Sequence, residues 1–357
     1  MIFIKKIPLC PPFSKGDLND ERRHACRQAG ATTSGQIEIV VLGVIFLMSI
    51  FVFSMAHKAS IEHKITRSRL LELQMYFFAR AGVECVLSAI ENDTTKIDTF
   101  SEAWGNHPEN YQKRPIKNGF FEVINGSNPD MFGAGDEEFK ININYADKNT
   151  MVGLFSTVVD SGEAKTLAET ILKYRGEEDG QITNQKGKEE DRKKTFGLVE
   201  ELLLIPEISE DLYAAIKDYI TVYGVGKINI NTVNDEVMKG LGLTDGLIGK
   251  INDYRKGVDG TLGTEDDRVF DTVGTIGGKL AGYISLTPKE RAKINAVKKR
   301  LGVRSDNFSF TSYGWIDGHT KKSIKVVAAR EKVKTDSESA EDADGKKELK
   351  IKYWYEE

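Results

Sequence analysis

Carboxylate side chains gather in one short stretch of the chain, at residues 259–267. The stretch reads Asp-Gly-Thr-Leu-Gly-Thr-Glu-Asp-Asp and carries four acids, Asp259, Glu265, Asp266 and Asp267. A hard cation such as calcium takes six to eight oxygen ligands, and a loop bent at glycines can wrap carboxylates and carbonyls around it. The spacing differs from an EF-hand, which has acids at alternate positions and a bidentate glutamate at the end. The residues alone therefore leave two interpretations, a calcium site or a solvated acidic turn.

No arrangement of residues in the sequence indicates catalysis. The nucleophile elbow G-x-S-x-G, the zinc motif H-E-x-x-H and the phosphate-binding P-loop do not occur, and His57, His63, His107 and His319 are scattered. The 50 Lys and Arg residues against 54 Asp and Glu residues give a net charge of −4, which offers no electrostatic footprint for nucleic acid. We therefore expect neither an enzyme nor a nucleic-acid-binding protein.

An uncharged apolar run occupies residues 39–56 and is followed by His57 and Lys58. As a helix at ~1.5 Å per residue it is about 27 Å long, close to the ~30 Å of a bilayer core. The run therefore predicts one membrane-spanning helix. Apolar residues then recur at steps of three to five residues, which predicts a continuous helix over 37–90 with one apolar stripe. The residues of this stripe are Ile61, Ile65, Leu70, Leu73, Phe77, Ala81 and Leu87.

A glycine, Gly35, stands just before the apolar run and behind a leader with Arg22, Arg23 and Arg27. This order resembles the N-terminus of a type IV prepilin or pseudopilin. The resemblance implies that prepilin peptidase cleaves after Gly35 on the cytoplasmic side, that Gln36 becomes the mature N-terminus, and that the mature protein is methylated. An ordinary single-pass anchor, oriented by the positive-inside rule, is the alternative.

The N-terminal region departs from major pilins at two positions. Position +1 is Gln36 and not an aromatic residue, and the acidic residue is Glu38 at +3, where major pilins place it at +5. Residues 1–20 have no periodicity, so we expect the true translation start to lie after them. The chain has three cysteines, Cys10, Cys26 and Cys85. Cleavage would leave only the last of them, which excludes an intrachain disulfide and a cysteine metal site in the mature protein.

An internal repeat organises the middle of the chain. Residues 139–144, Phe-Lys-Ile-Asn-Ile-Asn, recur as Gly-Lys-Ile-Asn-Ile-Asn at 226–231. Each copy is followed by a helical stretch with a similar end, at 171–176 and 251–257, and two such units can bury faces that one alone could not. A further helical segment follows each end, at 195–221 and at 269–296. The acids at the end of the first unit, Glu177, Glu178 and Asp179, form a second and weaker candidate calcium site.

The asparagines of the repeat are predicted to cap helices. Ile228 and Ile230 alternate inward on a short strand, and Asn231 or Thr232 can accept the first free amides of the helix that follows. The same role is expected for the remaining asparagines of the two copies, Asn142, Asn144 and Asn229. Acids in the first helical turn, Asp235 and Glu236, favour this position of the helix start.

β-Branched and aromatic residues predict strands on both sides of the repeats. The expected strands are 119–124, 139–143, 308–312, 323–330 and 349–354. An acidic, Ser- and Asp-rich segment at 334–347 is predicted to be a hairpin loop. The tryptophans, Trp104, Trp315 and Trp354, are expected in the core or at a sheet edge.

Three unlike segments, 200–207, 219–224 and 227–232, stand in an order that resembles the general secretion pathway protein K family, the large minor pseudopilins. The resemblance implies an α+β fold, in which a long N-terminal helix packs on an antiparallel sheet and a large helical insert holds two helix-hairpin-helix-like (SAM-like) repeats. We expect a leader over 1–35 and a transmembrane helix over 36–58. The remaining segments are a pilin-like domain in two parts, 59–138 and 301–357, and the insert over 139–300.

The family resemblance also implies a function. The protein is expected to sit in the inner membrane as a single-pass protein with its C-terminal domain in the periplasm. There it would cap the tip of a type II secretion pseudopilus with the I and J pseudopilins, above the major pseudopilin. Members of the family bind calcium, which favours calcium in the acidic loop. The alternatives are a competence-type DNA receptor, which would use its helical hairpins, and a type IV pilus minor pilin.

Overall fold

The computed structural model describes residues 21–178, 181–182, 194–332 and 347–357. Contacts divide the chain into two units, one up to Leu70 and the other from Leu71 to Glu357. Residues 1–20, Asp179 and nearly all of the predicted acidic loop at 334–347 lie outside the described residues.

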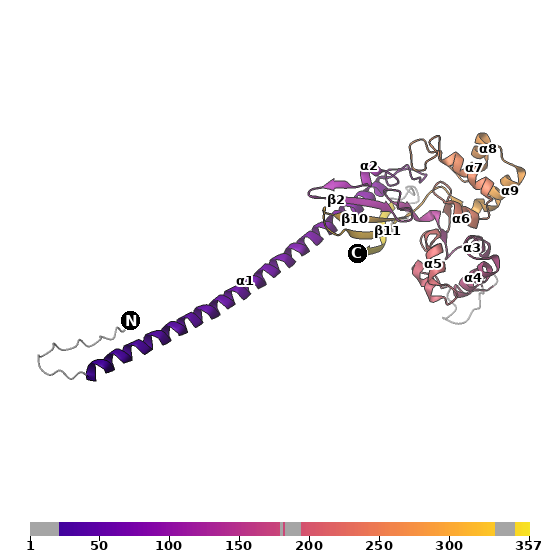
Figure 1. Cartoon of the computed structure of the whole chain (residues 1–357). Helices are drawn as coiled ribbons and strands as arrows, with labels where there is room; N and C mark the ends of the chain where they lie inside the picture. Colours follow the sequence, from indigo (N-terminus) through magenta and orange to yellow (C-terminus); the bar gives the residue numbers. More distant parts are fainter. Residues whose placement is uncertain (1–20, 179–180, 183–193, 333–346) are drawn as a thin grey trace, which may run out of the picture. The chain divides into compact units, whose positions relative to one another are not determined.

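A single long helix, α1 (Glu21–Asn92), runs through the first unit and into the second (Figure 1). It begins inside the expected leader and not at residue 37, because residues 21–34 are mostly good helix formers and include no proline. Residues 35–70 are exposed throughout. Among the described residues, the apolar side chains of 39–56 are therefore exposed along the helix and form no buried core.

In the second unit, α1 packs on the sheet through a face that the sequence did not predict. The buried residues are Met75, Phe78, Ala79, Val83, Val86 and Ile90. Of the predicted stripe, Leu87 packs against this core, whereas Leu73 and Phe77 are 50% and 53% exposed. Small residues select the buried face: a Cβ at Gly82 would overlap the Ser312 hydroxyl, so only glycine lets the helix come this close.

The sheet is antiparallel and takes strands from both ends of the chain. Its order is β1 (Arg114–Ile116), β2 (Gly119–Asn125), β10 (Asn307–Trp315), β11 (Lys322–Lys332) and β12 (Lys347–Glu356), and β3 (Gly135–Asp136) also pairs with β10. Figure 1 shows β2, β10 and β11 side by side, with the short helix α2 (Pro108–Tyr111) close by. The face toward α1 carries Val123, Phe308, Phe310, Ile324 and Val326, all buried. Trp104 and Trp315 are buried and Trp354 lies on the edge strand, as predicted.

Four of the five predicted strands belong to this sheet. The predicted strand at 139–143 does not. Residues 137–139 form a 3₁₀-helix, η1 (Glu137–Phe139), followed by β4 (Ile141–Asn142). β4 pairs in parallel with β7 (Ile220–Thr221), outside the main sheet. The strand ends after two residues because the Asn142 side chain accepts a hydrogen bond from the Asn144 amide at 2.9 Å and turns the chain.

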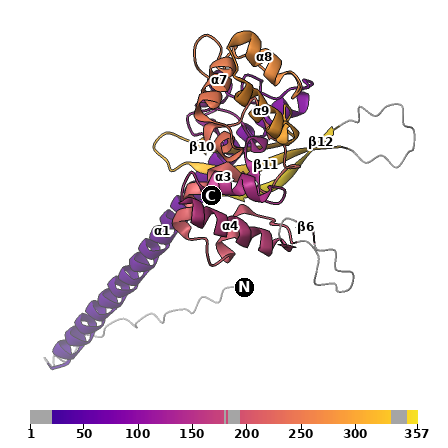
Figure 2. The same cartoon turned by 90° about the vertical axis from the view of Figure 1, so that its right-hand side faces the viewer.

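The insert repeats one order of elements twice. The first copy is β4, α3 (Lys148–Phe155), α4 (Ser161–Tyr174), the hairpin β5 (Glu177–Glu178) and β6 (Gln181–Ile182), η2 (Val199–Leu204), α5 (Glu210–Ile216), η3 (Lys217–Tyr219) and β7. The second is β8 (Ile228–Asn229), α6 (Asp235–Gly240), α7 (Asp245–Arg255), α8 (Ile276–Tyr283), α9 (Pro288–Val297), η4 (Lys298–Arg300) and β9 (Leu301–Gly302). β8 pairs in parallel with β9, as β4 does with β7. Figure 2 shows α7, α8 and α9 of the second copy grouped together.

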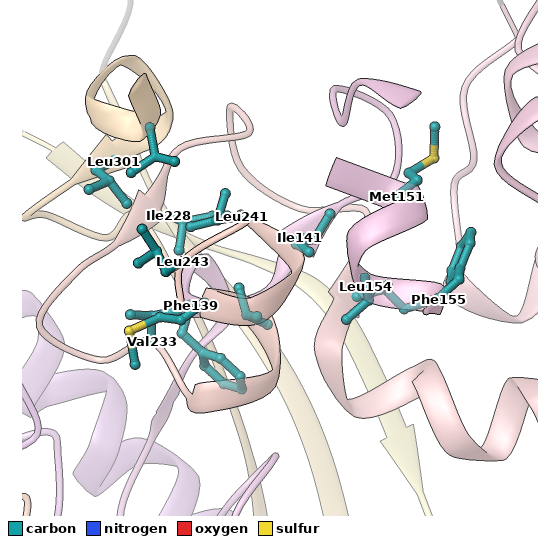
Figure 3. Packing of buried hydrophobic residues seen from close by; sticks show 14 of the residues in the cluster. Phe139, Ile141, Met151, Leu154, Phe155, Ile228, Val233, Leu241, Leu243 and Leu301 are labelled. Carbon is teal, nitrogen blue, oxygen red and sulfur yellow. The ribbon is translucent and has the colours of Figure 1, made fainter. Parts of the chain in front are cut away.

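One hydrophobic core serves both repeats. Side chains from the first copy, such as Ile141 and Leu154, and from the second, such as Ile228 and Leu241, belong to the same cluster (Figure 3). The two copies meet closely where a Cβ on Gly153 would overlap the Gly240 carbonyl oxygen. Because neither copy could bury these faces alone, the insert is one packed unit. The predicted α+β class, with a long helix, an antiparallel sheet and further helices, is confirmed.

Candidate functional site

Asn144 and Asn231 act as clamps, and the prediction that the asparagines of the repeat cap helices is wrong, because the caps are other residues. Asn144 Nδ2 donates to the Phe196 carbonyl at 3.0 Å, and the Phe196 amide donates to Asn144 Oδ1 at 2.8 Å. Asn231 holds Phe270 by the same two bonds, at 3.2 and 2.9 Å. Each clamp ties the start of a repeat to the loop before its second helical segment.

The helix caps lie three residues further along the chain from each clamp. Asp147 accepts from the Thr150 amide at the start of α3, and Asn234 accepts from the Val237 amide at the start of α6. A turn over 142–146 in the first copy and 229–233 in the second delays each helix. Asparagine prefers both caps and turns, so composition alone could not separate the two roles.

A buried arginine completes each repeat. Arg175 donates to the Ile143 and Ala146 carbonyls at 3.0 and 2.8 Å. Arg255 donates to the equivalent carbonyls of Ile230 and Val233, at 2.9 and 2.8 Å, and burial lowers its pKa to about 10. The structural equivalence of the two copies therefore extends to single hydrogen bonds.

Two of the three candidate acids of the first repeat, Glu177 and Glu178, belong to the described residues. Glu177 binds the Arg175 guanidinium at 2.8 Å, which gives this carboxylate a structural role. Glu178 lies in β5, and Asp179 is outside the described residues.

In the acidic loop at 259–267, Asp266 organises the backbone. Its Oδ2 accepts from the amides of Val258 at 2.5 Å and Asp259 at 3.0 Å, and its Oδ1 accepts from the Thr264 hydroxyl at 2.9 Å. These donors hold the pKa of Asp266 below its usual value. Asp259 in turn accepts from the Thr261 amide at 2.7 Å.

Asp267 differs from its neighbours because one of its oxygens is buried without a partner. Oδ2 accepts from the Gly263 amide at 2.7 Å, while Oδ1 has no hydrogen bond. Burial raises the pKa of this carboxyl above its usual value. Glu265 is exposed. The loop thus brings Asp259, Asp266 and Asp267 into one hydrogen-bonded turn and leaves Glu265 outside it.

The loop fits a hard cation by the chemistry of its donors. All of its side-chain donors are carboxylate or hydroxyl oxygens, and the buried Oδ1 of Asp267 is available to bind. Its carboxylates are not gathered into one cluster: in the part of the chain that the structure describes, three acids whose oxygens lie within 4.8 Å of one another occur only at Asp93, Asp98 and Glu102. Asp266 and Asp267 are the residues that would hold calcium, with Asp259 next to them.

The acidic loop also contacts the pilin-like part of the molecule. Gly263 has a φ of 85°, and a Cβ there would lie 2.8 Å from Cβ of Asn106 and 3.4 Å from Cβ of Phe100. Both neighbours follow α1. The loop therefore joins the second repeat to the segment between α1 and the sheet.

The cluster of Asp93, Asp98 and Glu102 was missed by the sequence interpretation. Its cation is an arginine: Arg330 NH1 lies 2.7 Å from Asp98 Oδ1, and NH2 lies 2.5 Å from Asp93 Oδ2. Arg330 is 232 residues from Asp98 along the chain. No local pattern could have linked them.

The α6–α7 hairpin, which a DNA receptor would use to contact phosphate, carries an exposed acid. At the α6–α7 hairpin, the Asp245 side chain is 88% exposed and lies 3.6 Å from Lys239. Gly35, Gln36 and Glu38 are exposed on α1. The apolar run of α1 has a mean hydropathy of 2.8 over its best window, and its helix is long and apolar enough to cross a membrane.

Comparison with solved structures finds a chain in the crystal structure of the GspK-GspI-GspJ complex from the enterotoxigenic Escherichia coli type 2 secretion system. The TM-score is 0.56 at 14% sequence identity, and the match covers 82% of this chain and 99% of that chain. No family model and no curated protein matches the sequence.

The fold is therefore that of a pilin-like α+β protein whose sheet is divided by a large helical insert. Among folds of this class, the fold of this chain is GspK-like, that of a minor pseudopilin, as the sequence resemblance implied.

Proposed function

We propose that this protein is a minor pseudopilin of a type II secretion system. The observation that carries the proposal is the match to a chain of the GspK-GspI-GspJ complex, which covers 82% of this chain and 99% of that chain. At 14% identity the two chains share a fold but little sequence. The proposed assembly with other pseudopilins therefore depends on features of this chain.

The anchor is consistent with this role. The apolar side chains of residues 39–56 are exposed. Their contact with water would be unfavourable in free energy, whereas their contact with the hydrocarbon core of a bilayer would not. Prepilin peptidase cleaves after Gly35 on the cytoplasmic side, and α1 then holds the mature protein in the inner membrane by one span, with residues from about 60 onward in the periplasm.

The partners are the I and J pseudopilins, with the major pseudopilin below them. The insert at 141–302 is large compared with the sheet that carries it, and it would obstruct a subunit stacked above. The protein therefore occupies the tip of the pseudopilus and does not extend it. Calcium binds the acidic loop through Asp266 and Asp267.

Mass spectrometry of the membrane-extracted protein tests the processing step. We expect the mature chain to begin at Gln36, and Gly35→Leu to keep the leader, because prepilin peptidase requires a small residue before its cleavage site. Gly43→Ala is the matched control: this glycine also lies on α1 with open space around it, and its variant should be cleaved normally. An intact leader in cells that process their other prepilins would contradict the proposal.

Copurification tests the assembly step separately. The tagged full-length protein, extracted in detergent from cells that express the I and J subunits, should retain both through washing. Failure to retain either subunit, with normal processing at Gly35, would leave a pseudopilin-type anchor but refute the proposed complex.

A further inference from the structure

We propose that three buried carboxylates, Asp98, Asp136 and Glu138, form a proton-dependent latch that holds the helical insert to the pilin-like part and loosens as the pH rises. The latch lies where the segment after α1, β3 with η1, the turn after β8, and the β9–β10 connection meet. Asp98 and Asp136 have no exposed surface and Glu138 has 6%.

Asp136 is the centre of this junction. Its Oδ2 accepts from the hydroxyl groups of Ser305 at 2.5 Å and Thr232 at 2.6 Å, and from Asn229 Nδ2 at 3.0 Å. Its Oδ1 accepts from the Glu138 amide at 2.6 Å. One carboxyl group thus connects the second repeat, through Asn229 and Thr232, to β3 and to the connection that enters the sheet.

Asp98 extends the junction toward α1. Its Oδ2 accepts from the Ser305 amide at 2.8 Å and its Oδ1 accepts from Arg330. Its carbonyl accepts from Asn229 Nδ2 at 3.0 Å.

Glu138 extends it toward β10. Its carboxylate accepts from Asn307 Nδ2 and from the Asp306 amide, both at 2.9 Å. The insert is therefore attached by a continuous polar network and not only by apolar packing.

Acids outnumber cations in this network. The charged groups that face it are Asp93, Asp98 and Glu102 after α1, Asp136 and Glu138 on β3 and η1, and Arg330 on β11. Asp306, before β10, also faces the network and has an interaction of its own, so it is not counted among the excess acids. The nearby pair of Glu137 and Lys140, 2.6 Å apart, is neutral overall. Because uncompensated buried charge is costly, the network retains a proton where water would remove it.

The hydrogen-bond partners indicate which group carries the proton. Asp98 and Glu138 accept from N–H donors, which have no lone pair to receive a proton in return. Asp136 is bonded to two hydroxyl groups, and a hydroxyl can rotate to accept. The protonated form of Asp136 therefore fits its surroundings without displacing a partner.

The direction of the pH dependence follows from burial. Burial raises the pKa of Asp98 to about 7 and of Glu138 to about 8, and also raises that of Asp136. Between the ordinary carboxyl pKa of about 4 and these raised values, the folded state binds more protons than the unfolded state. Stability is therefore highest near the ordinary carboxyl pKa, falls as the pH rises toward about 7 to 8, and levels off above that range. Deprotonation of Asp136 puts a further buried negative charge beside Glu138.

Urea unfolding of the full-length chain in detergent, at intervals from pH 5 to pH 9, tests the latch. We expect the folding equilibrium constant to fall by up to about tenfold per pH unit where one proton is lost. Asp136→Asn keeps the shape of the protonated group and should reduce this slope, because it removes one titrating acid and its charge beside Glu138, and Glu138→Gln is the second variant if the first does not fold. Glu331→Gln, at an exposed acid on β11, is the control and should keep it.

Hydrogen exchange locates the effect. Amides of residues 229–233 and 303–307 should exchange faster at pH 9 than the rise in the intrinsic amide exchange rate with pH explains. Asp136→Asn should suppress this additional exchange. A flat or rising stability from pH 5 to pH 7 in the unmodified chain overturns the latch, as does a slope that both variants retain unchanged.

Discussion

At the scale of single residues, the two repeats are closed by asparagine and arginine side chains that bond to the backbone. Asn144 and Asn231 each satisfy one amide and one carbonyl of a buried phenylalanine. Arg175 and Arg255 each bind two carbonyls. These bonds lie in low dielectric, where an unmade partner is expensive.

The clamp predicts a large effect of a small truncation. Asn231→Ala leaves the amide and the carbonyl of Phe270 buried without partners, so we expect a loss of about 2–3 kcal/mol in the free energy of unfolding. Asn144→Ala should cost a similar amount at Phe196. Chemical unfolding of the full chain measures both.

The control for the clamps is Asn295→Ala, at an exposed position of α9, which should change stability by less than about 0.5 kcal/mol. If Asn231→Ala behaved like Asn295→Ala, the repeat asparagines would be incidental to the fold.

The acidic loop gives a second prediction at this scale. Calcium bound only by the native loop adds RT ln(1 + [L]/Kd), about 2.7 kcal/mol at a hundred times Kd. The melting temperature should therefore rise by several degrees in millimolar calcium and return with chelator. Asp267→Asn should remove most of the shift, since its Oδ1 is the buried oxygen without a partner, and the double change with Asp266→Asn should remove it completely.

Asp253→Asn, an exposed acid on α7, should keep the calcium response. A melting curve that ignores calcium in the unmodified protein would reduce residues 259–267 to a solvated acidic turn.

At the scale of elements, close approach decides how α1 meets the sheet. A Cβ on Gly314 of β10 would overlap the Met75 carbonyl and the Ala79 amide, both backbone groups that cannot rotate away. We expect Gly314→Ala to destabilise the protein by about 3 kcal/mol, the upper part of the range for overpacking. Thermal and urea unfolding check it.

Gly278→Ala is the matched control, because this exposed glycine of α8 has open space around it and alanine is the better helix former. It should be neutral or stabilise slightly. Equal effects of the two changes would mean that helix and sheet are not in tight contact at Gly314.

The elements also show what sequence patterns can and cannot predict. Strands β2, β10, β11 and β12 and the two repeats were predicted because alternation and repetition are local signals. The buried face of α1 was not, since it depends on Gly82 and on Ser312, which lies far away in sequence. The Asp98–Arg330 pair and the latch arise from folding alone. For the acidic loop, sequence identified the residues, but only geometry distinguished Asp267 from Glu265.

At the scale of the whole molecule, the insert determines the proposed place in the assembly. A pseudopilus grows by stacking subunits whose anchor helices pack together. In the proposed assembly, a subunit that carries the insert at 141–302 would obstruct further stacking above it. A place at the tip also predicts that the N-terminus of the mature protein can lack the acid at position +5.

In major pilins the acid at +5 meets the N-terminal amine of a neighbour in the apolar layer, where an unpaired charge would be costly. Here position +5 is Val40, and the acid is Glu38 at +3. A tip subunit has no neighbour above it to contact, so the missing acid carries no penalty. Glu38→Ala should therefore leave secretion close to normal when the variant replaces the native protein.

The measurement is the secreted fraction of a substrate of the system, with the level and processing of the variant checked by immunoblot. Val40→Glu is the informative counterpart: restoring an acid at +5 gives it no amine to meet at the tip, so it should weaken assembly and not improve it. If Glu38→Ala abolished secretion at a normal protein level, or if Val40→Glu increased it, the subunit would have a neighbour above it, and the argument for the tip would fail.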